Sequence, residues 1–136
     1  MGNKISIPKI NFEDVQDSIN KNIIINTLPP NNQSCLIKGT LNYNEEEELI
    51  NNLLKTNKSK KIIIYGLHSN DESIFDKYDQ LIKLGFSEIY IYIGGMFEWL
   101  CLQDIYGEEL FPTTSKQLDI LKYKPKSQFK TLLLEY

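Results

Sequence analysis

The chain has 136 residues, of which 41% are hydrophobic and 24% charged, and its formal net charge is -3. These values predict a single globular domain with a buried core and exclude a disordered chain. We expect no nucleic-acid partner, because nucleic-acid-binding domains carry a strongly basic face. All positive side chains are lysine, so no guanidinium is present to bind a phosphate in bidentate fashion.

The cysteines and apolar segments indicate an intracellular protein without a membrane span. Cys35 and Cys101 are the two cysteines, too few for a disulfide scaffold, which favours a reducing compartment. No apolar run approaches the ~18 residues that a spanning helix needs. The N-terminus also lacks the apolar core of a secretory signal.

The first 41 residues predict an arm, a helix and two strands. Residues 1–10 form a short polar arm. Asn11 can cap a helix whose apolar positions have helical spacing, at Phe12, Val15 and Ile19. The β-branched run Ile23–Ile25 is typical of a buried strand, and residues 36–41 predict a second, short strand.

The middle of the chain alternates helices with strands. Asn44 can cap a helix that begins with four glutamates, which suit the positive end of a helix dipole. Residues 62–65 form the clearest strand, followed by a loop over 66–71 and a helix from about Glu72 to Leu84. Gly85 is expected to end that helix.

The last part predicts a strand, two helices and a basic tail. Residues 89–93 form the strand, and Gly94-Gly95 turns the chain into a helix from Met96 to about Gln103. A last helix is expected near 116–121. The remaining residues, 122–136, form a lysine-rich tail.

This alternation predicts an α/β fold with a mostly parallel sheet between two layers of helices. Ligands bind such folds at the carboxyl ends of the strands. The loop after residues 62–65 is therefore the first place to look for a functional site.

Three segments resemble the rhodanese-like domain family. They are Lys61-Ile62-Ile63-Ile64-Tyr65-Gly66, Leu84-Gly85-Phe86, and the Gly-Gly-x-x-x-Trp pattern of residues 94–99. Residues 23–28 and 36–41 fit the earlier half of the family more loosely. The resemblance covers about residues 11–112 and implies a three-layer α/β/α rhodanese-like domain, which we place at 11–121.

Active members of this family carry a loop of the form Cys-x-x-Gly-x-Arg directly after the strand. Its backbone N–H groups form an anion cradle that stabilises the cysteine thiolate. In this sequence the resemblance puts Gly66 at the nucleophile position and Asp71 at the arginine. The two carboxylates of Asp71 and Glu72 would repel an anion, so we expect neither thiosulfate nor phosphate to bind.

The rest of this loop reads as capping rather than catalysis. The full degenerate loop is Gly66, Leu67, His68, Ser69, Asn70 and Asp71. Ser69 and Glu72 have capping-box spacing, so the protein is expected to fill its own anion cradle with side chains. We expect His68, the only histidine, to be an exposed loop residue. No Cys/His spacing supplies a metal site, and no cofactor is expected.

The first six residues match the N-myristoylation pattern Met-Gly-x-x-x-Ser/Thr, which makes Gly2 the acceptor and Ser6 the second specified position. One myristoyl chain binds membranes only marginally. The lysines of the tail can add attraction to anionic lipid. The pattern places the protein in the cytoplasm, peripheral on the cytosolic face of a membrane.

The sequence thus favours a catalytically inactive rhodanese-like binding or adaptor module, tethered by myristate and acting through a protein partner. Met96, Phe97 and Trp99 are mostly expected in the core, and any that are exposed would serve as interface anchors. One alternative is a divergent sulfurtransferase or phosphatase-like enzyme that uses Cys35, whose polar loop leaves exposure open, or Cys101, whose neighbours indicate a buried thiol. Another is a soluble structural subunit with Gly2 unmodified.

Overall fold

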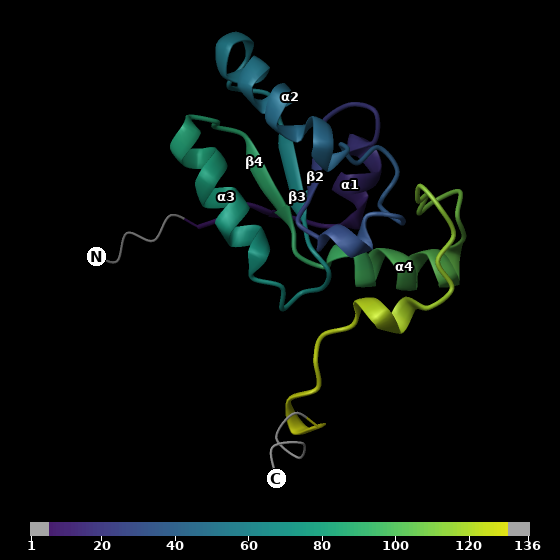
Figure 1. Ribbon diagram of the computed structural model, residues 1–136. Helices are drawn as coiled ribbons and strands as arrows, with labels where there is room; N and C mark the ends of the chain where they lie inside the picture. The colour runs from purple at the N-terminus through teal and green to yellow at the C-terminus, as the bar shows by residue number, and fades with distance from the viewer. Residues whose placement is uncertain (1–5, 131–136) are drawn as a thin grey trace.

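The computed structural model describes residues 6–130. Four strands form one parallel sheet: β1 (Lys9–Ile10), β2 (Ile23–Asn26), β3 (Ile62–Tyr65) and β4 (Ile89–Tyr92). Their order across the sheet is β1-β4-β3-β2, so β3 and β4 lie in the centre (Figure 1). The predicted parallel α/β architecture is confirmed.

Four α-helices cover the two faces of this sheet. Helices α2 (Tyr43–Thr56) and α3 (Ser73–Leu84) pack on one face, while α1 (Phe12–Ser18) and α4 (Gly95–Tyr106) pack on the other. Two short 3-10 helices, η1 (Pro30–Asn32) and η2 (Ile120–Tyr123), lie in the connections.

The strand residues alternate between the two faces, as extended backbone requires. In β3, Ile63 and Tyr65 point toward α1 and α4, whereas Ile62 and Ile64 point toward α2 and α3. All four are buried, which explains why β3 is a continuous apolar run rather than an alternating one.

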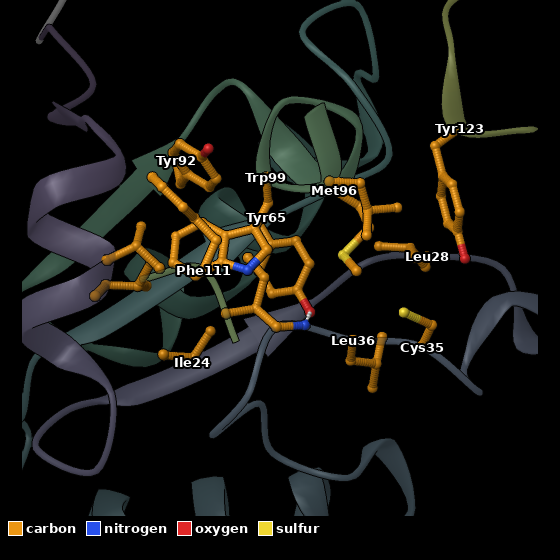
Figure 2. Close-up of a cluster of buried hydrophobic side chains, with 14 residues drawn as sticks. Ile24, Leu28, Cys35, Leu36, Tyr65, Tyr92, Met96, Trp99, Phe111 and Tyr123 are labelled. Atoms are coloured by element: carbon orange, nitrogen blue, oxygen red, sulfur yellow. Dashed lines mark hydrogen bonds between the residues drawn. The ribbon is translucent and has the colours of Figure 1, made fainter. Parts of the chain in front are cut away.

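Large aromatic side chains fill the face that α4 covers, around Trp99 (Figure 2). The Trp99 ring meets Phe111 and Tyr92 edge to face, with centroids 5.1 and 6.2 Å away. Its indole N–H donates to the Pro112 carbonyl oxygen at 3.1 Å. Trp99 therefore joins α4, β4 and the loop after α4 into one core.

The segment over residues 36–41 is not a strand, contrary to the prediction. It makes two isolated bridges, Ile37 with Thr113 and Ile24 with Thr40. Between them the Tyr65 hydroxyl accepts the Ile37 N–H at 3.1 Å and lies 2.8 Å from Thr40 Oγ1. A side chain from β3 thus takes the hydrogen bond that a neighbouring strand would otherwise make.

Other boundaries also differ from the sequence expectations. Asn42, not Asn44, caps α2. The expected helix near 116–121 is the 3-10 turn η2, which ends on the buried Tyr123. The arm contributes β1, in which Lys9 and Ile10 pair with β4. Within residues 6–130, no helix is long and apolar enough to cross a membrane.

Replacing Trp99 with alanine tests this account of the core. Trp99 is fully buried, so we expect Trp99→Ala to lower the free energy of unfolding by about 3–5 kcal/mol. Leu118, which is 82% exposed, is the control, and Leu118→Ala should change it by less than about 0.5 kcal/mol. Denaturant titration measures both, and equal losses in the two variants would contradict this packing.

Candidate functional site

The candidate site lies where the carboxyl ends of β3 and β4 meet. The chain leaves β3 for α3 on one face of the sheet and leaves the adjacent β4 for α4 on the other. Such a divergence of neighbouring connections creates the crevice in which α/β folds bind ligands. The loop of residues 66–72 and the turn of residues 93–95 lie at this end of β3 and β4.

The loop and the turn are joined through their backbones. The Met96 N–H donates to the Gly66 carbonyl oxygen at 2.9 Å, and the Phe97 N–H donates to that of Leu67 at 2.8 Å. Gly95 permits this approach, because its φ is +69° and a Cβ there would lie 2.7 Å from the Gly66 oxygen. Two N–H groups at the start of α4 are therefore already bonded to the loop.

The Asp71 carboxylate sits inside the loop and accepts three hydrogen bonds. The Leu67 N–H donates to Oδ2 at 2.8 Å, while the Ser73 N–H and hydroxyl donate to Oδ1 at 3.0 and 2.6 Å. The Leu67 and Ser73 N–H groups are therefore bonded to a carboxylate of the chain itself and are not free to bind an external anion. This arrangement agrees with the expectation that the protein fills its own cradle.

The ionised form of Asp71 is favoured by these contacts. Burial on its own would raise the pKa of the Asp71 carboxyl. The hydrogen bonds from Leu67 and Ser73, together with nearby His68, outweigh that effect and hold the pKa below its ordinary value of 3.8. The loop therefore contains a negative charge at neutral pH.

Gly66 is glycine because of the space that Asp71 occupies. A Cβ on Gly66 would lie 2.5 Å from Asp71 Oδ2 and 3.0 Å from Ile74 Cγ2. The backbone of Gly66 is not in the left-handed region, so conformational freedom is not the reason. A side chain at this position and the present position of Asp71 are sterically incompatible.

The capping of α3 differs from the predicted Ser69–Glu72 box. Helix α3 begins at Ser73, Glu72 makes no side-chain cap bond, and Ser69 is exposed. Asp71 binds the Ser73 backbone two residues ahead, as an aspartate does in an Asx turn. Sequence reasoning missed Ser73, although the Asp-x-Ser spacing at a helix start carries this signal.

His68 is half-buried rather than exposed, and its Nδ1 accepts the Asn70 N–H at 3.1 Å. That bond tightens the turn over residues 68–71, where the Asp71 N–H also donates to the His68 carbonyl oxygen. Among residues 6–130, no group of three or more His, Cys, Asp or Glu side chains is placed to hold a metal ion.

The structure buries Cys35, in its polar loop, more deeply than Cys101. Cys35 is 1% exposed, and its thiol donates to the Ser115 carbonyl oxygen at 3.3 Å. Cys101 is only half-buried. Burial, followed by Asp104 and Glu98, raises the pKa of the Cys101 thiol. The segment around Cys35 is polar in sequence, but Thr114 and Ser115, about 80 residues further along the chain, bond to it and cover it.

Of the three proposed interface residues, only Phe97 reaches the surface. Met96 and Trp99 are fully buried in the core, so neither is available as an anchor. Next to Phe97, Glu98 folds back over Gly94 and accepts a hydrogen bond from the Tyr92 hydroxyl. Burial and this carboxylate both raise the pKa of Tyr92, which stays a proton donor.

Comparison with known proteins places this geometry in a family. The model of the rhodanese-like domain family matches residues 11–101. The chain therefore belongs to the rhodanese-like domain family, and both the resemblance in its sequence and the predicted rhodanese-like α/β fold are confirmed.

Solved structures with the same fold include Ygr203w, described as a yeast protein tyrosine phosphatase of the Rhodanese family. The match has a TM-score of 0.59 and 14% sequence identity, and it covers 86% of this chain and 99% of that one. A crystal structure of the Alr3790 protein from Anabaena sp. matches with a TM-score of 0.56 and 18% identity, covering 83% of this chain and 97% of the other. No curated protein sequence matches this chain.

A double-mutant cycle tests the steric relation between Gly66 and Asp71. We expect Gly66→Ala to lower the free energy of unfolding by about 1–3 kcal/mol, because the new methyl group meets the carboxylate. In an Asp71→Ala background, the loss of unfolding free energy caused by Gly66→Ala should be smaller by about 0.5–3 kcal/mol.

Denaturant titration of the four proteins measures this coupling energy. Gly107→Ala serves as a matched glycine control, because a Cβ there would meet nothing within 4 Å. Its φ of +102° still imposes a backbone cost, but that cost should be independent of Asp71. Additive effects of Gly66→Ala and Asp71→Ala would contradict the described contact.

Proposed function

We propose that this chain is a catalytically inactive rhodanese-like binding module, tethered to a membrane by myristate on Gly2. The observation that carries the proposal is the pair formed by Gly66 and Asp71. The position after β3 has no side chain, and a carboxylate occupies the space beside it.

Sulfur transfer at this loop would need a nucleophile and a way to hold an anion. Gly66 supplies no nucleophile. A thiosulfate or phosphate group entering the loop would meet the ionised Asp71, and the Leu67 and Ser73 N–H groups are already bonded to it. Two like charges ~4 Å apart repel by about 1 kcal/mol in water and by several times more when partly desolvated.

The properties of the two cysteines also favour a binding role. A catalytic thiol is usually accessible and has a lowered pKa. Cys35 is buried and donates a hydrogen bond to a carbonyl oxygen, while the pKa of Cys101 is raised. The divergent-enzyme alternative requires one of these two thiols, because they are the only cysteines in the chain.

The partner-binding surface that we propose is the rim of the former active site and the outer side of α4. Loop residues Ser69 and Asn70 are exposed there, and Phe97 is partly exposed. Toward the end of α4, Ile105 and Tyr106 are 70% and 61% exposed. Exposed apolar side chains of this size are the usual anchors of protein interfaces.

The tether is proposed from the N-terminal pattern alone. Gly2 lies outside the described residues, and the first strand, β1, begins only at Lys9. The alternative without a tether is a soluble structural subunit.

An activity assay tests the inactive site. The purified protein should transfer no sulfur from thiosulfate above a no-protein control, and Gly66→Cys should not restore transfer, because Asp71 still occupies the loop. Iodoacetamide should alkylate Cys35 and Cys101 no faster than free cysteine at neutral pH, with the denatured protein as the control. Activity that is lost in Cys35→Ser or Cys101→Ser would instead establish the divergent enzyme.

Co-expression with an N-myristoyltransferase tests the tether. We expect the intact mass to increase by one myristoyl group in the wild type and not in Gly2→Ala. Binding to vesicles should weaken when Gly2 is replaced, since one acyl chain contributes an association constant of about 10⁴ M⁻¹. An unmodified wild type would support the soluble subunit.

A further inference from the structure

The segment of residues 116–130 carries the opposite charge to the rest of the chain. It contains five lysines and one acidic residue, Asp119, for a net charge of +4. The rest of the chain holds the other 10 of the 15 lysines and 17 of the 18 acidic residues, for a net charge of -7. An acidic domain therefore ends in a basic segment.

This segment is fixed to the domain at its centre. Tyr123, at the end of η2, is 1% exposed, and Ile120 packs against the same core. Figure 2 shows the Tyr123 side chain reaching inward toward Leu28, Cys35 and Met96. Because two side chains point inward, the orientation of their neighbours is set by the fold.

The neighbouring apolar side chains point outward. Leu118, Leu121 and Phe129 are 82%, 64% and 80% exposed. Burial of a leucine or phenylalanine stabilises a chain by about 1.5–3 kcal/mol, so leaving three of them in water is unfavourable. Three of the nine large hydrophobic side chains that are exposed within residues 6–130 therefore lie in this one segment.

Exposed lysines follow Leu121 in the same segment, and Lys130 follows Phe129. Four of them form no ion pair within residues 6–130: Lys122, Lys124, Lys126 and Lys130. Lys116 lies 3.8 Å from Glu108, but both side chains are well exposed, so this pair is weak. Residues 122–130 therefore carry four positive charges and no acidic residue.

We propose that residues 118–130 bind the surface of an anionic lipid bilayer. Leu118, Leu121 and Phe129 enter the boundary between headgroups and acyl chains, and the four lysines lie among the lipid phosphates. A flat, diffuse negative surface suits lysine, which acts as a mobile point charge. A discrete phosphate site would favour the planar fork of arginine, which this chain lacks.

The distribution of charge over the fold suits this orientation. The glutamates Glu45, Glu47 and Glu48 are exposed at the start of α2. Figure 1 shows the segment after η2 at the end of the molecule away from α2. With residues 118–130 on the bilayer, this acidic cluster faces away from the anionic headgroups and is not repelled by them.

The contact extends the membrane tether of the proposed function by supplying the second signal that a single acyl chain needs. It is tested on unmyristoylated protein, made without a transferase. Binding by residues 118–130 is then measured independently of the myristate tether. We expect such protein to sediment with vesicles that contain phosphatidylserine and not with vesicles of phosphatidylcholine alone. Binding should weaken as the salt concentration rises.

Charge variants identify the segment responsible. Each lysine at an anionic surface contributes about a five-fold increase in binding, so changing Lys122, Lys124, Lys126 and Lys130 to glutamine should lower the partition coefficient by at least about 100-fold. The matched control changes four exposed lysines elsewhere, Lys55, Lys58, Lys61 and Lys83, and should have less than about a three-fold effect. Leu118→Ser with Phe129→Ser should weaken binding while leaving its salt dependence unchanged.

Three results would overturn the proposal. One is the absence of wild-type binding to phosphatidylserine vesicles. The second is equal binding to both kinds of vesicle, and the third is an equal loss in the two lysine variants, which would indicate a general effect of net charge. The denaturation midpoints of all variants are compared first, and the exposed positions chosen should leave them unchanged.

Discussion

The hydrogen bonds to the Asp71 carboxylate hold the loop between β3 and α3 in its present shape. They join the start of the loop, at Leu67, to the first residue of the helix, at Ser73. The same loop is tied to α4 through the Gly66 and Leu67 carbonyl oxygens. One ionised side chain therefore links the two ends of the loop that follows β3.

This constraint accounts for the unusual residues nearby. Gly66 has no side chain because the carboxylate lies where a Cβ would make contact, and Gly95 has none because the loop backbone lies against it. Both glycines thus follow from close packing around the loop. In physical terms, the loop already contains an anion, the Asp71 carboxylate, which its own chain supplies.

Much of the fold was predictable from the sequence, because local patterns and tertiary structure agree. The buried run of β3, the helix that ends at Gly85 and the Gly-Gly turn before α4 all lie where the sequence places them. The segment at 36–41 was predicted wrongly as a strand, since it turns between its two isolated bridges and its Ile37 N–H bonds to the side chain of Tyr65. No local pattern reports a partner that lies 28 residues away.

The candidate site was predictable in place but not in detail. The sequence located the loop and anticipated a carboxylate in the cradle. It did not assign the cap to Asp71, because Ser69, Asp71 and Glu72 are all good capping residues and only the position at which α3 begins selects among them. It also did not predict the burial of Cys35, which depends on how the chain after α4 returns over the loop at 33–37.

The position of the Asp71 carboxylate can be measured most directly by its titration. Carbon-13 NMR of the side-chain carboxyl group, with nitrogen-15 spectra of the Leu67 and Ser73 amides, follows the group and its donors in one pH series. We expect a midpoint below 3.8 that both amides share, because the bonds favour the ionised form. A midpoint at or above 3.8, or amides that do not respond at that midpoint, would show that the carboxylate does not occupy the cradle.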